Sequence, residues 1–215
     1  MYRIRSFAPL FAVLALAAAS PPATSAQESY PAATSPQSVA ASPFLADYLA
    51  EIDRVRGQIQ ALAEAMPQET HDWRPGEGVR SAGEVYLHMA FGNYLLPRVA
   101  GYAPPAELAD HREVAKLQAW DTSTTDKEEI AEILARSFDH LRATADGIPD
   151  AELEDTVEFF GQTPTKRQLL LIVLGHLHEH LGQSIAYARV NGVVPPWTAA
   201  QQAARPQDAE RSDGN

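Results

Sequence analysis

Hydrophobic residues recur every three or four positions in four stretches of the chain, which is the spacing of one buried helix face. The first stretch begins at Ser42, a candidate N-cap, with Pro43 at the first helical position. A connection with Pro75 and Gly76 follows it. One apolar stripe of this helix is expected to be buried: Leu45, Tyr48, Leu49, Ile52, Val55, Ile59, Leu62 and Met66.

The second and third stretches each open with a capping-box pattern, in which Ser or Thr precedes Glu by three residues. Ser81 and Glu84 begin the second helix, which is expected to end near Pro97. Thr125 and Glu128 begin the third helix, and residues 147–149 end it.

The fourth stretch begins with Thr165 and Gln168 in the same pattern, and Asn191 and Gly192 supply its stop signal after about Val190. No alternating pattern long enough for a strand is present in the sequence. Four amphipathic helices with connections of varied length predict an all-α protein, an antiparallel four-helix bundle.

Both ends of the chain differ in composition from this helical part. Residues 1–26 contain two arginines, an apolar stretch too short to span a bilayer and a run of small residues, and they are expected to be a signal peptide. The alternative is an uncleaved membrane anchor. Residues 27–42 are predicted to be a disordered linker, residues 43–197 the folded domain and residues 198–215 a disordered tail. The mature protein is therefore expected to be exported, periplasmic or secreted, and free of the membrane.

Charge and cysteine content restrict the chemistry further. The net charge is −11, and loss of a signal peptide with two Arg and no acidic residue would make it −13. A chain this acidic repels nucleic acid and anionic lipid, so we expect neither as a partner. The absence of Cys excludes thiolate nucleophiles and cysteine-type zinc sites. Any metal ligand must be His, Asp or Glu.

Three histidines are candidate metal ligands. His176 and His180 lie one turn apart on a face of the last helix that also carries residues expected to point inward: Leu169, Ile172, Val173 and Tyr187. His88 occupies an inward position of the second helix. An unpartnered buried imidazole costs roughly 1–3 kcal/mol, whereas a divalent ion uses its nitrogen as a ligand. The alternative is that these histidines are hydrogen-bonded core residues, because the pattern does not establish that the two helices are neighbours.

Two residues near the pair are candidates for a supporting role. Gln183 lies one turn beyond His180 and could orient a ligand or a bound water, or be an ordinary polar residue at the rim. Glu179 precedes His180 and is the second candidate. The remaining histidines are predicted to be surface or supporting residues: His71, His111, His140 and His178.

From about Phe44 to Trp197 the chain resembles the DinB-like family of bacterial four-helix-bundle metalloproteins. One block consists of AMP at 65–67, WRP at 73–75 and VRS at 79–81, leading to Glu84 and His88. Another has SFDH at 137–140 and FFG at 159–161. The most specific block is HLHEHLGQ at 176–183, followed by AYAR at 186–189, NG at 191–192 and PPW at 195–197.

The resemblance implies a metal site with one histidine on the second helix and two on the last, which fall on His88, His176 and His180. It further implies a zinc- or nickel-like ion and, often, a homodimer. Some relatives are metal-dependent thiol transferases and others have no assigned activity. Leu181 stands where many members have Arg, which puts in doubt any role that needs a positive charge beside the site.

Two functions remain as hypotheses. The first is an exported enzyme whose three-histidine metal, most readily zinc or nickel and next iron or manganese, activates a small molecule for thiol transfer or hydrolysis. The small thiols used by such transferases are usually cytoplasmic, which argues against thiol transfer by an exported protein. The second is a non-catalytic metal-binding or stress-related bundle. No catalytic residue can be named, since Glu84, one turn before His88, already serves the capping box.

Overall fold

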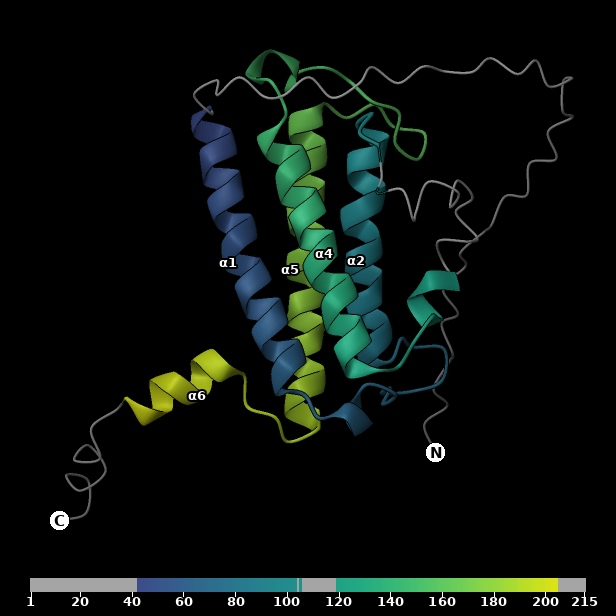
Figure 1. The fold of residues 1–215 in the computed structure, drawn as a ribbon, viewed down its shortest axis with the longest axis vertical. Coiled ribbons are helices and arrows are strands. Elements are labelled where there is room, and N and C mark those ends of the chain that lie inside the picture. Colours follow the sequence, from purple (N-terminus) through teal and green to yellow (C-terminus); the bar gives the residue numbers. More distant parts are fainter. Residues whose placement is uncertain (1–41, 104, 106–118, 205–215) are drawn as a thin grey trace, which may run out of the picture. The chain divides into compact units, whose positions relative to one another are not determined.

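The computed structural model describes residues 42–103, 105 and 119–204. Four long helices lie side by side (Figure 1): α1 (Pro43–Ala65), α2 (Ala82–Val99), α4 (Lys127–Asp146) and α5 (Lys166–Val190). Within these residues the other elements are three short 3-10 segments and one short helix: η1 (Gln68–Thr70), η3 (Ala119–Thr122), η4 (Asp150–Glu152) and α6 (Pro196–Ala203). The predicted all-α bundle is confirmed.

The order of packing brings α2 and α5 together. Each of α1 and α2 packs against both α4 and α5. α1 and α5 run in one direction through the bundle, and α2 and α4 run in the other (Figure 1). α2 and α5 are therefore antiparallel neighbours, whereas α2 and α4 are parallel because the chain re-enters the bundle at the end where α2 began.

The helices begin where the capping signals predict, with one correction. The Ser42 side chain accepts from the backbone N–H of Leu45 at the start of α1, and both capping boxes at Ser81 and Thr165 are complete. The N-cap of α4 is Asp126 and not Thr125, and its carboxylate accepts from the backbone N–H of Glu129. Asp is as good an N-cap as Thr or better, so the start of the helix moves by one residue.

The core is formed by apolar side chains from all four long helices. The whole predicted stripe of α1 is buried, and Phe138 from α4 and Leu177 from α5 are fully buried against it. The prediction that Ile172 of α5 points inward is wrong, because this residue is 39% exposed. It lies in the first turns of α5, before the part of the helix that carries the paired histidines.

Two further expectations are corrected at the connections. Residues 198–203 belong to α6, which contacts α1, and are not part of a disordered tail. His71 was expected at the surface or in a supporting position, but it is completely buried. Its Nδ1 lies 3.2 Å from the carbonyl oxygen of Pro67. α2 ends at Val99, close to Pro97 as expected.

Several expectations concern residues outside the described part of the chain. They are the signal peptide at 1–26, the linker at 27–41, His111 and the tail from residue 205. Within the described ranges, none of the helices combines the length and apolar character that crossing a bilayer requires.

Candidate metal centre

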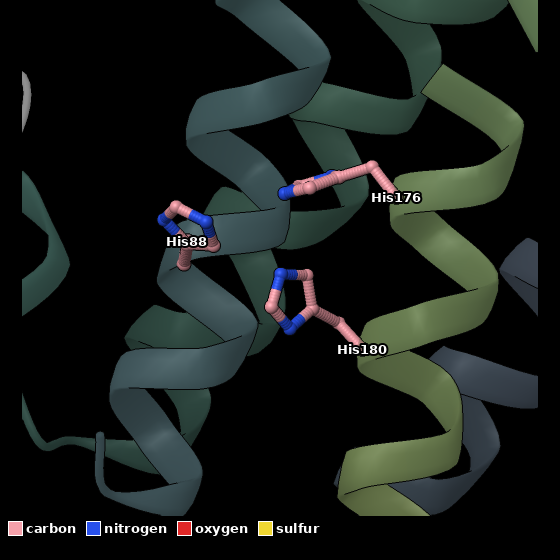
Figure 2. Close-up of side chains that lie close together, drawn as sticks. All are labelled: His88, His176 and His180. Atoms are coloured by element: carbon pink, nitrogen blue, oxygen red, sulfur yellow. The ribbon is translucent and has the colours of Figure 1, made fainter. Parts of the chain in front are cut away.

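His88, His176 and His180 come together between α2 and α5. Figure 2 shows the His88 ring extending from α2 toward the two rings that project from α5. One nitrogen from each residue lies within 4.8 Å of the others. The ring centroids are 5.1 Å apart for His88 and His176, 4.9 Å for His88 and His180, and 4.6 Å for His176 and His180. Small side-chain rotations would bring all three nitrogens onto one ion.

His88 is oriented by a carboxylate that the sequence did not indicate. Its Nδ1 donates to Oδ2 of Asp121 in η3, at 3.1 Å, so that Nε2 is left as the free ligand atom. The same Oδ2 accepts from Nε of Arg80, also at 3.1 Å. Asp121 is 33 residues from His88 along the chain, and no local spacing links the two.

His180 is oriented from the other side by residues of its own helix. Its Nδ1 donates to Oε1 of Gln183 at 2.8 Å, which again leaves Nε2 free. Gln183 Nε2 donates to the hydroxyl of Tyr187 at 2.8 Å, and that hydroxyl donates to the carbonyl oxygen of Arg80 at 3.3 Å. The structure thus brings Gln183 to the site as a residue that supports a histidine. Tyr187 was expected only as a packing residue.

The series of hydrogen bonds behind His88 and the series behind His180 meet at Arg80. Arg80 holds Asp121 through its guanidinium and Tyr187 through its carbonyl oxygen, and it directly precedes Ser81, the N-cap of α2. A continuous path therefore runs from His88 through Asp121, Arg80, Tyr187 and Gln183 to His180. It restrains His88 and His180, on two helices, from outside the cluster.

His176 has no such support. Its buried Nδ1 has no hydrogen-bond partner within the described ranges. The ring instead lies against the backbone of α2 at Gly92, where a Cβ atom would be 2.7 Å from His176 Cε1 and 3.0 Å from Nδ1. A side chain at position 92 would fill the space that the imidazole uses.

The surroundings favour the neutral form of His176 and His180, which is the form that binds metal. Burial lowers the pKa of His176 to about 3, helped by the neighbouring His180, His88 and Arg80. Burial also lowers the pKa of His180, and the bond to Gln183 opposes this shift in part. An unpartnered buried nitrogen among three converging imidazoles fits a divalent cation.

The other candidate residues lie outside the cluster. Glu179 is exposed, and no hydrogen bond joins it to a described residue, although its charge raises the pKa of His180 slightly against the lowering by burial. His178 instead bonds Glu51 of α1 at 2.9 Å, and half-buried His140 packs on the ring of Tyr94. Glu84 completes its capping box, as its position predicts, and its side chain also pairs with Arg74.

A positive charge does lie beside the cluster despite the apolar Leu181. Leu181 is buried in the core. Arg80 supplies the charge from the connection before α2, through the carboxylate that it shares with His88.

The fold and the site define a four-helix bundle with a three-histidine cluster between two antiparallel helices. A family model of the DinB superfamily matches residues 51–184, and the chain belongs to this superfamily. No curated protein matches the chain.

Two solved structures share the fold. A DinB-like protein from Bacillus cereus is 17% identical, with a TM-score of 0.57, and the match covers 71% of this chain and 93% of that one. A DinB-like protein from Bacillus subtilis is 19% identical, with a TM-score of 0.54, and the match covers 69% of this chain and 94% of that one.

Proposed function

We propose that this chain binds one divalent metal ion through Nε2 of His88, Nε2 of His180 and a ring nitrogen of His176. The observation that carries the proposal is the approach of three ligand nitrogens within 4.8 Å of one another. Three imidazoles from rigid helices, with no fourth ligand among the described residues, are typical of catalytic zinc sites. Zinc and nickel are the first candidates, followed by iron and manganese, because imidazole suits several of these ions.

The residues around the cluster prepare it for an ion. Asp121 and Gln183 fix the tautomers of His88 and His180, and carboxylate or amide partners of this kind raise the basicity of a ligand imidazole. A bound ion would act as a Lewis acid and lower the pKa of a bound water or thiol. His88 and His176 are partly exposed, so a small molecule can approach from solvent.

We further propose that the protein is an exported metal-dependent enzyme that transfers a thiol to an electrophile or hydrolyses a small substrate. Membership of the DinB superfamily and the open histidine site support this proposal. The apolar segment at residues 7–19 behind two arginines supports export. A non-catalytic metal-binding bundle is the competing function.

Metal binding is tested first, on mature protein purified without chelator or a nickel affinity column. Inductively coupled plasma mass spectrometry is expected to find about one ion per chain, as a three-histidine site with one open position implies. His88→Ala and His180→Ala should each lose the ion and keep their helix content. His178→Ala is the matched control, since His178 lies on the same helix and bonds Glu51 instead. Stoichiometric metal in either site variant would refute the assignment.

Activity is tested by comparing metal-loaded and metal-stripped protein. One assay follows the loss of small thiols in the presence of an activated aryl halide, and a second follows hydrolysis of activated esters. Turnover that returns with added metal and is absent from His88→Ala supports the enzyme. Stoichiometric metal with no turnover in either assay favours the non-catalytic bundle.

Export is tested on the full chain expressed in a bacterium with both membranes intact. Mass spectrometry of the protein released from the periplasm is expected to show a new N-terminus at or near Gln27. Retention of residues 1–26 in the membrane fraction would support the uncleaved anchor instead.

A further inference from the structure

Arg80 holds a cation at a fixed place beside the histidine cluster. Its Nε donates to Asp121 Oδ2, which also accepts from His88, and its carbonyl oxygen accepts from Tyr187. Both the backbone and the side chain of Arg80 are therefore tied to the groups that support the metal ligands. A cation held in this way keeps its position relative to the site.

The outer end of this guanidinium is available to a ligand. Its side chain is 41% exposed, whereas Asp121 beneath it is only 9% exposed. In the described part of the chain, the two terminal nitrogens of Arg80 have no hydrogen-bond partner. Such a planar pair of N–H donors matches the two oxygens of a carboxylate.

Charge at the site favours an anion. Asp121 neutralises one positive charge, that of Arg80, with which it forms an ion pair. With a divalent ion bound, the positive charge on the ion is not balanced by any of these residues.

We propose that Arg80 forms an anion subsite, so that the molecule bound at the metal carries a carboxylate that the guanidinium receives. This inference rests on the proposed metal site, because the ion binds the reacting end of the molecule and Arg80 binds its anionic end. It assigns the substrate to small carboxylate-bearing molecules. Arg80 thereby determines specificity in addition to supporting Asp121.

The test uses the mature protein saturated with Co²⁺, whose visible absorption reports a thiolate ligand. The probes are 3-mercaptopropionate and its methyl ester, which share the thiol and differ in the carboxylate charge. The wild-type protein is expected to bind the acid about tenfold more tightly than the ester, the size of one partly exposed charge-assisted interaction. This preference should shrink as salt is raised.

Variants separate the subsite from a purely structural role. Arg80→Gln should bind acid and ester alike, because the acid loses more affinity than the ester, and Arg80→Lys should restore part of the preference. Arg136→Gln, which changes an exposed arginine of α4 paired with Glu132, should behave as wild type. A structural role alone would weaken acid and ester equally in Arg80→Gln.

The outcomes also separate this inference from the proposed function. Equal affinities for acid and ester in the wild-type protein, with Co²⁺ bound, would overturn the subsite and leave the metal site standing. A preference for the acid that survives in Arg80→Gln would overturn the subsite as well. Direct binding of the carboxylate to Co²⁺ would then explain the preference. Failure to bind Co²⁺ at all would overturn both.

Discussion

The ring of His176 rests on the backbone of Gly92, so closely that a Cβ atom there would lie 2.7 Å from His176 Cε1. This contact joins α5 to α2 directly behind the cluster. Because no other described group holds His176 by a hydrogen bond from Nδ1, the bare backbone at Gly92 decides where the ring lies.

Gly92→Ala is expected to displace His176 and to lower metal affinity at least about tenfold, the scale on which misplaced ligands act. The fold should survive, because the clash falls on the end of a movable ring and Ala favours helix. Competition with a chromophoric chelator measures the affinity, and circular dichroism measures the helix content.

Gly182→Ala is the matched control for this change. Gly182 is also helical and lies in α5 near His180, but an added Cβ meets nothing within 4 Å. It should keep full metal affinity and gain up to about 1 kcal/mol in the free energy of unfolding. Equal metal affinity in the Gly92 and Gly182 variants would contradict the role given to Gly92.

Asp121→Asn tests the carboxylate behind His88. The amide keeps the shape of the side chain but loses the charge that Oδ2 shares between His88 and Arg80. Metal affinity should fall roughly 10- to 100-fold. Asp139→Asn, which changes an exposed carboxylate of α4 paired with Arg56, should leave the affinity unchanged. Unchanged affinity in Asp121→Asn would show that the carboxylate does not support the ligand.

Tyr187→Phe removes the hydroxyl that joins Gln183 to Arg80. The aromatic packing on Trp73 stays, with ring centroids 5.3 Å apart in the native protein. Loss of this hydroxyl should lower the free energy of unfolding by about 1 kcal/mol, as measured by urea denaturation. Metal affinity should fall only a few-fold, because Gln183 still contacts His180. A loss of metal affinity as large as that expected for His180→Ala would mean that Tyr187 acts more directly on the ion.

The stability of the metal-free protein should fall as the solution becomes more acidic than pH 6.5. The pKa of His176 is about 3 in the native protein, while in the unfolded chain it takes its ordinary value of 6.5. Above pH 6.5 neither state binds the proton; below it only the unfolded state does, and the native state loses relative stability until the pH approaches 3. At pH 5, protonation of this one residue in the unfolded chain should lower the free energy of unfolding by about 1–2 kcal/mol relative to pH 7.5.

Urea denaturation of metal-free wild type and His176→Gln at both pH values isolates this contribution. The variant should lose less stability on acidification than the wild type. A residual drop is expected, because burial also lowers the pKa of His71, His140 and His180. Identical pH dependence in the two proteins would rule out His176 as a source.

The sequence by itself determined the helices and the local part of the site. Periodicity and side-chain caps act over three or four residues, so Ser42, Ser81 and Thr165 mark helix starts without knowledge of the rest of the chain. The same short-range geometry places His176 and His180 on one face and Gln183 within reach of His180. Where two good caps compete, as at Thr125 and Asp126, it placed the start of the helix one residue too early.

Only the tertiary structure decided which helices are neighbours and which distant residues meet. His88 reaches the other two histidines because α2 and α5 pack as antiparallel neighbours, and this choice depends on the whole core. Asp121 and Arg80 reach the site from connections, where hydrophobic periodicity carries no information about position. The burial of His71 likewise depends on how a connection folds back on the bundle. Helix formation is decided by nearest neighbours along the chain, whereas these contacts are decided by packing between segments far apart in it.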